Sequence, residues 1–132
     1  MAKGCSAVVI HSDRLDFYKN FLNFLKPIHP ISKLRNKQLE VLSALLYKRA
    51  EISEKVTDPA LIPKLLFSAD TREDVLKMCG ISAMNYYGMM AEMKKLKIVA
   101  DNDLSKKVIP EPVNGKFSLV ISFNILPSQA EK

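Results

Sequence analysis

The chain has 132 residues, 48% of them hydrophobic and 26% charged, a balance that is typical of one folded domain and excludes a disordered chain. Its net charge of +6 favours an acidic partner such as nucleic acid. No apolar run could span a membrane or form the core of a signal peptide, and the two cysteines fit neither a disulfide framework nor a zinc site, so we expect a cytoplasmic protein.

The first third of the chain is predicted to contain a leader and two helices. We expect a leader over residues 1–12, with a short strand at 7–10, and a helix over 13–25 that begins at Ser12 or Asp13. Pro27 and Pro30 end this helix. A second helix is predicted from Ser32 or Leu34 to Arg49, with a core stripe of Leu39, Leu42, Leu45 and Leu46.

The 13–25 helix is apolar around much of its surface, because two adjacent stripes of side chains run along it. One stripe consists of Leu15, Tyr18, Leu22 and Leu25, and the other consists of Phe17, Phe21 and Phe24. A small domain usually buries one such stripe. We therefore expect the second to meet another copy of the chain, in a homodimer through residues 13–25, or a different protein.

The middle of the chain is predicted to contain a polar loop at residues 51–60, a short helix at 61–67 and a longer helix that ends at Cys79. Two overlapping capping-box patterns mark the start of the longer helix, namely Asp70-x-x-Glu73 and Thr71-x-x-Asp74. The side chain of Cys79 is expected to face the core.

Residues 80–82 are predicted to form the turn of a helix-turn-helix over about 70–96. Gly80 can adopt the left-handed conformation that ends a helix, Ile81 can pin the turn to the core, and Ser82 is a good N-cap for the next helix. A short helix, a tight turn and a longer helix with this spacing are typical of DNA-binding helix-turn-helix proteins.

The C-terminal part is predicted to be β. We expect a short strand at Ile98-Val99, and Asn114-Gly115 is a strong two-residue hairpin turn. Residues 117–125 alternate apolar and mostly polar side chains, which predicts a half-buried strand. Its partner over 108–113 contains two prolines, so it must be an edge or irregular strand. This hairpin is the predicted wing.

Together these elements predict a mainly α fold with a small β-hairpin (α+β), a winged helix-turn-helix with an extra N-terminal helix. We expect the leader and apolar helix to occupy residues 1–30, the winged helix to occupy 31–126, and a frayed tail to occupy 127–132.

Several segments also resemble a known family. They are Leu34-Arg35-Asn36-Lys37-Gln38-Leu39-Glu40-Val41-Leu42, Lys64-Leu65-Leu66-Phe67-Ser68 with Thr71-Arg72, Gly80-Ile81-Ser82, Val108-Ile109-Pro110 and Phe123-Asn124-Ile125. Over residues 32–125 the chain is similar to the small winged-helix proteins of Bacteroidales phages, the crAss-like group among them. This resemblance implies a winged-helix fold and a role as a transcriptional regulator. The N-terminal helix lies outside the resemblance.

Two residues depart from the wider winged-helix pattern. Lys97 stands where glycine is usual, so either the helix ends by another route or Lys97 adopts a left-handed conformation at some cost. Gly88 lies inside the presumed recognition helix, where glycine costs about 1 kcal/mol relative to alanine. It either allows close approach of a partner or is simply tolerated.

The presumed recognition helix has a core face and an opposite face that could read DNA. If Tyr86, Met90, Met93 and Leu96 face the core, the opposite face carries Ala83, Met84, Asn85, Tyr87 and Gly88, with Ala91 at its margin. Ser82, at the N-cap, is also predicted to contact DNA. Asn85 can pair with adenine, Tyr87 can donate to a phosphate, and Ala83 or Met84 can touch a thymine methyl. The face lacks arginine, the commonest base-reading side chain.

Basic side chains are expected to supply phosphate contacts. Clusters lie at residues 26–49 and 94–107, and the predicted contacts include Lys94, Lys95, Lys106, Lys107 and Lys116. Each cluster taken alone is more typical of a solvated surface.

No catalytic constellation is present in the sequence, since His11 and His29 lack metal-ligand partners and no glycine-rich phosphate loop exists. We expect no enzyme activity, no metal and no cofactor. Two functions stay open: a DNA-binding regulator of phage or mobile-element origin, and a winged-helix scaffold that binds protein in a virion or assembly complex.

Overall fold

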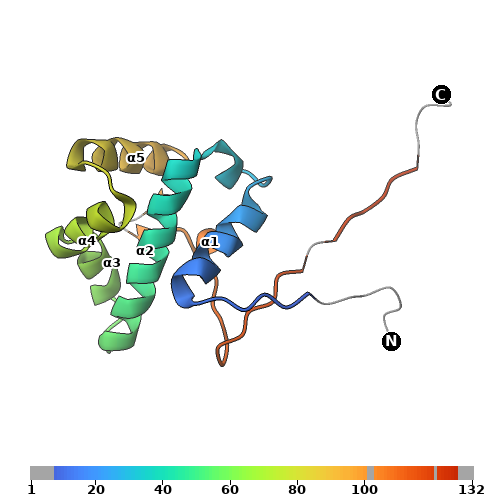
Figure 1. Ribbon diagram of the computed structural model, residues 1–132, viewed down its shortest axis with the longest axis horizontal. Helices are drawn as coiled ribbons and strands as arrows, with labels where there is room; N and C mark the ends of the chain where they lie inside the picture. Colours follow the sequence, from blue (N-terminus) through green and yellow to red (C-terminus); the bar gives the residue numbers. More distant parts are fainter. Residues whose placement is uncertain (1–7, 101–102, 121, 128–132) are drawn as a thin grey trace.

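The computed structural model describes residues 8–100, 103–120 and 122–127, and this part of the chain is mainly helical (Figure 1). The helices are α1 (Arg14–Leu25), α2 (Asn36–Lys55), α3 (Leu61–Leu66), α4 (Ala69–Cys79) and α5 (Ala83–Lys95), with short 3₁₀ turns at Ile31–Lys33 and Lys106–Val108. A small antiparallel sheet joins β1 (Val99–Ala100) to β2 (Asp103–Leu104), with Val99 opposite Leu104. The expected combination of helices with a little β structure is confirmed.

Helix α2 is the centre of the core. It packs against α1 on one side and against α3 and α4 on the other, as Figure 1 shows. Its predicted leucine stripe is confirmed, because Leu39, Leu42, Leu45 and Leu46 are all buried. Helix α5 lies across the N-terminal end of α2, where Arg35 pairs with Glu92 at 3.1 Å.

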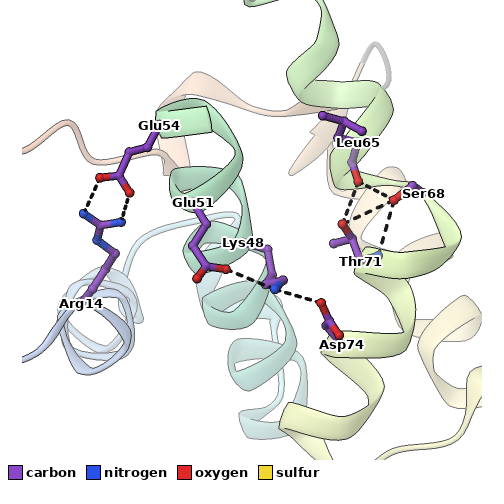
Figure 2. A network of polar contacts seen from close by, with 8 residues as sticks. All are labelled: Arg14, Lys48, Glu51, Glu54, Leu65, Ser68, Thr71 and Asp74. Carbon is purple, nitrogen blue, oxygen red and sulfur yellow. Dashed lines mark hydrogen bonds and ion pairs between the residues drawn. The ribbon is translucent and has the colours of Figure 1, made fainter. Parts of the chain in front are cut away.

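Helix α2 extends to Lys55, so the prediction of a polar loop over residues 51–60 is wrong for residues 51–55. Between Asn36 and Lys55 the sequence contains no glycine or proline that would end a helix. Ion pairs also hold this last part in place. Glu51 pairs with Lys48 within α2, and Glu54 forms a two-point pair with Arg14 of α1 (Figure 2).

Of the two N-caps predicted for α1, Asp13 is the one that occurs, because it accepts a hydrogen bond from the backbone N–H of Asp16 at 2.8 Å. The starts predicted for α4 are wrong, because its N-cap is Ser68, which precedes both Asp70 and Thr71. Thr71 is buried inside the first turn and donates its hydroxyl to the carbonyl of Leu65 at 2.7 Å (Figure 2). Thr71 therefore ties α4 to α3, a role that a local capping pattern cannot reveal.

Helix α5 is bracketed by two left-handed residues. Gly80 (φ 63°) ends α4 as predicted, and the N–H of Ile81 bonds to the carbonyl of Leu76 at 3.2 Å. Lys97 (φ 62°) ends α5 in the same way, where the N–H of Ile98 bonds to the carbonyl of Met93 at 3.0 Å. Of the two alternatives for Lys97, the left-handed conformation is the one that occurs.

The predicted wing is present as a turn but not as a hairpin. Asn114 and Gly115 have positive φ, and Val113 pairs with Lys116 through bonds of 2.8 and 3.0 Å. The prediction of a half-buried strand over 117–125 is wrong for the described residues, which have no strand partner. The segment starts beside α1 and its later part runs away from the helices (Figure 1). Residue 121 lies outside the described part.

The pairing stops at the turn, and the segment before it, which contains Pro110 and Pro112, forms no strand in the described residues. An irregular segment here agrees with the expectation from its two prolines. In the register set by Val113 and Lys116, however, both prolines would fall at positions that form no ladder hydrogen bonds, so their missing N–H groups do not by themselves end the pairing. The strand predicted at Ile98-Val99 does form, shifted by one residue, and it pairs with Asp103–Leu104, a strand that the sequence did not indicate.

The second stripe of α1 is covered largely by this chain. Phe117 packs edge-on against Phe17 and Phe21, with ring centroids 5.4 and 5.5 Å apart. Phe24 remains 49% exposed. The expectation that this whole stripe needs a second chain is therefore wrong for Phe17 and Phe21, whereas contact of Phe24 with another molecule stays a prediction.

The two ends of the chain agree only partly with expectation. Residues 8–10 are exposed and form no strand, so the strand predicted at 7–10 is wrong for them, and residue 7 lies outside the described part. Most of the predicted tail, residues 128–132, also lies outside it. Cys79 faces the core as predicted, and burial raises the pKa of its thiol.

Candidate nucleic-acid interface

The inner face of α5 holds this helix against the core. Tyr86, Met90 and Met93 are buried and Leu96 is partly buried, as their spacing predicts. Burial raises the pKa of Tyr86, and the nearby Arg72 guanidinium opposes that shift. Because this face is fixed, the opposite face of α5 is presented to solvent.

The outer face of α5 carries the side chains that were predicted to read DNA. Ala83, Met84, Asn85, Tyr87 and Gly88 are all exposed, and Met84 reaches 83%. Ser82 differs from them, because its hydroxyl accepts the N–H of Asn85 at 3.2 Å as the N-cap. Within the described residues the Asn85 side chain has no hydrogen-bond partner, so its amide is available to a ligand.

Tyr87 is ordered by two neighbours. The Arg72 guanidinium carbon lies 5.7 Å from the centre of its ring, within the range of a cation–π contact. The ring also meets Tyr86 edge-on at 5.8 Å. Sequence reasoning missed Arg72, because its place beside Tyr87 depends on how α4 crosses α5 rather than on any local pattern.

The predicted phosphate-binding lysines fall into two groups. Lys94 and Lys95 are exposed in the last turn of α5, and no carboxylate in the described part of the chain lies within ion-pair distance of either. Glu92, the acid of this helix, is already paired with Arg35. Lys106 and Lys107 lie instead beside α1, where they line a groove with Phe21. Lys116 is exposed at the 113–116 turn.

The basic cluster at residues 26–49 is largely used inside the molecule. Lys37 pairs with Glu40 at 3.0 Å, and Arg49 makes a two-point pair with Asp103 at 3.1 and 3.2 Å. Lys48 lies between Glu51 and Asp74 at 3.1 and 3.0 Å (Figure 2). Most of this positive charge is therefore neutralised locally, which a count of charges along the sequence does not show.

Comparison with protein-family models, with curated proteins and with solved structures finds no match to this chain. None of the helices in the described ranges combines the length and the apolar character needed to cross a bilayer. The same ranges contain no group of three or more histidine, cysteine or acidic side chains that could hold a metal ion.

Proposed function

We propose that this protein binds duplex DNA as a winged helix-turn-helix regulator, with α5 as the recognition helix. In this proposal α2, α4 and α5 form the helical unit, β1, β2 and the 113–116 turn form a reduced wing, and the phage origin implied by the resemblance is retained. Asn85, Tyr87 and Met84 face the major groove, and Lys94 and Lys95 contact phosphates.

The observation that carries the proposal is the outer face of α5, which is exposed and ends at Lys94 and Lys95, two lysines with no carboxylate partner among the described residues. A major groove admits an α-helix whose polar side chains can reach base edges. The available amide of Asn85 fits adenine, and the exposed thioether of Met84 fits a thymine methyl.

The test is a titration of fluorescent random-sequence duplex with the full chain. We expect affinity to fall about 10-fold to 1000-fold between about 50 and about 200 mM salt, because several lysines would release counterions from phosphates. A dissociation constant weaker than about 100 μM at about 50 mM salt would contradict DNA binding. A second titration with Asn85→Ala should weaken binding to an adenine-containing selected site by about 1–3 kcal/mol.

A second candidate function is that of a protein-interaction module, for example in a virion or an assembly. It is favoured by the apolar side chains of the extended segments, since Phe123 and Ile125 are 83% and 92% exposed. Contiguous exposed apolar surface commonly marks a protein interface. Light scattering should then show an assembly that a Phe123→Ser/Ile125→Ser double variant dissociates without loss of helical content. A monomeric wild-type chain would contradict self-association.

A further inference from the structure

A groove lies between α3 and α5, and residues of α4 and β1 complete its lining. Its volume is about 390 Å³, which falls in the size range of small-molecule sites. Phe67, Tyr86 and Met90 give it an apolar and aromatic wall. The groove is therefore large enough for a molecule of two fused rings and has surface on which such rings can pack.

Three cations from three different helices line the same groove, namely Lys64, Arg72 and Lys94. None of the described residues that line it is acidic, and in the described ranges none of the three cations has a carboxylate within ion-pair distance. Positive charge beside apolar walls focuses the electric field into a cleft. A neutral occupant would leave this charge unused, whereas an anion would be attracted by all three groups.

The aromatic side chains and the cations are arranged together. The Arg72 guanidinium lies 5.7 Å from the centre of the half-exposed ring of Tyr87, a cation–π contact that restrains it beside this ring. On α5, Lys94 follows Tyr87 by about two helical turns, which separates the two residues by roughly 10 Å along the helix axis. That span matches a two-ring aromatic body with a charged group at one end.

We propose that this groove binds a small anionic ligand with an aromatic body, whose rings pack on Tyr87 and Met90 and whose carboxylate, sulfonate or phosphate group meets Arg72 or Lys94. Nine residues line the groove, whereas a standard protein interface uses about 20–30 residues on each side, so the lining fits a small molecule better than a folded protein. The proposal goes beyond DNA binding and does not depend on it, although Tyr87 and Lys94 belong to both surfaces.

The probes are 2-naphthoate, 2-naphthyl phosphate and the neutral 2-naphthamide, each titrated into the full chain and followed by backbone amide chemical shifts. We expect the two anions to bind with a dissociation constant of about 1 mM or tighter, as is usual for ligands of this size. Shifts should concentrate in α3, α4 and α5 around the groove. The amide has the same rings without the charge, and it should bind about fivefold or more weakly. The better of the two anions identifies the preferred headgroup.

Matched variants locate the charge that matters. Arg72→Gln and Lys94→Gln should each weaken 2-naphthoate about 3-fold to 10-fold. Lys77→Gln in α4 and Lys95→Gln in α5 make the same charge change outside the lining and should leave affinity unchanged. Thermal melts of the variants check that each is folded.

Three results would overturn the proposal. Equal binding of 2-naphthamide and 2-naphthoate would show that charge plays no part. Equal weakening by the control variants would show that the effect is general electrostatics. An acidic peptide that shifts the groove residues while 2-naphthoate does not would assign the site to a protein segment instead.

Discussion

Helices α2 and α5 are both rich in basic side chains, but they use them differently. In α2, Lys37, Lys48 and Arg49 each face a carboxylate of the same molecule. In α5, Lys94 and Lys95 have no such partner within the described residues, and the acid next to them is held by Arg35. The number of charges along a helix is therefore a poor guide to the charge that it offers to a partner.

The two helices differ equally in their apolar side chains. Helix α2 is surrounded by other helices and buries a continuous row of residues, whereas α5 buries one face and exposes the other. We therefore regard α2 as the helix that determines stability and α5 as the helix that meets a ligand. Single substitutions in and around the two helices test this division.

The largest effect is expected from Leu42→Ala in α2. Leu42 is fully buried, so its truncation should lower the free energy of unfolding by about 2–5 kcal/mol through lost transfer energy and the cavity left behind. Met84→Ala in α5 is the control, because this side chain is exposed and its loss should change stability by less than about 0.5 kcal/mol. Urea denaturation measures both. Similar losses in the two variants would refute the division.

The turns that bracket α5 should respond in opposite directions. Gly80→Ala places a side chain in a left-handed conformation and should cost about 1–2 kcal/mol, since an added Cβ meets no other atom within 4 Å and the backbone alone is strained. Lys97 already holds a side chain in this conformation, so Lys97→Gly should stabilise the protein by about 1 kcal/mol. The melting temperatures of the two variants measure both effects. Changes of the same sign would show that the two turns are not equivalent.

Loss of an internally paired cation should cost more than loss of a free one. Lys48→Met leaves Glu51 and Asp74 without their shared partner and should destabilise by about 1–2 kcal/mol. Lys95→Met in α5 removes an unpaired charge and should change stability by less than about 0.5 kcal/mol. Denaturation at neutral pH compares the two variants, and an equal cost would contradict the distinction.

The ion pairs of Lys48 should also make the free energy of unfolding depend on pH. Burial disfavours the charge of Lys48, but hydrogen bonds to Asp74 and Glu51 outweigh it and raise its pKa above the ordinary 10.5. A raised pKa contributes stability that is fully present below the unfolded value and is lost as pH rises through the folded value. Lys48→Met should therefore lose less stability than wild type above about pH 10.5. Burial also raises the pKa of Tyr18 and Tyr86, so part of the stability lost at alkaline pH should be lost both in wild type and in Lys48→Met.

The smallest change is expected from Gly88→Ala. An added Cβ meets no atom within 4 Å, so the fold does not need glycine here and alanine should stabilise α5 by up to about 1 kcal/mol. If DNA approaches this face closely, the same variant should bind duplex more weakly. Stabilisation without any loss of DNA affinity would show that Gly88 is merely tolerated.

Local chemistry predicted most of the helical part of the fold. The N-caps at Asp13 and Ser82, the left-handed Gly80 and the buried face of α5 follow from short-range patterns, and all are observed. The reading face of α5 was predicted for the same reason, since it is simply the face opposite the core.

Long-range pairing is what the sequence could not show. The pair between Glu54 of α2 and Arg14 of α1 joins residues far apart in the sequence, and the position of Thr71 depends on a carbonyl in the preceding helix. The alternation after residue 117 is a real β signal, but a strand also needs a neighbouring strand, and the segment before the turn, with its two prolines, does not form one. Of the groove cations, Lys94 was predicted as a phosphate contact, whereas Lys64 and Arg72 were missed because their place beside it depends on how α3 and α4 pack on α5.

The most direct test of the account compares the salt dependence of DNA binding in two double variants. Lys94→Gln/Lys95→Gln removes the two lysines of α5 that have no carboxylate partner among the described residues. Lys26→Gln/Lys37→Gln is the control, because Lys26 donates to the side-chain oxygen of Asn36 and Lys37 pairs with Glu40 near the start of α2. We predict that the first variant lowers the slope of log affinity against log salt by about 2, and that the second leaves it unchanged. An unchanged slope in the α5 variant, or an equal decrease in both, would contradict the claim that α5 presents the DNA-binding charge.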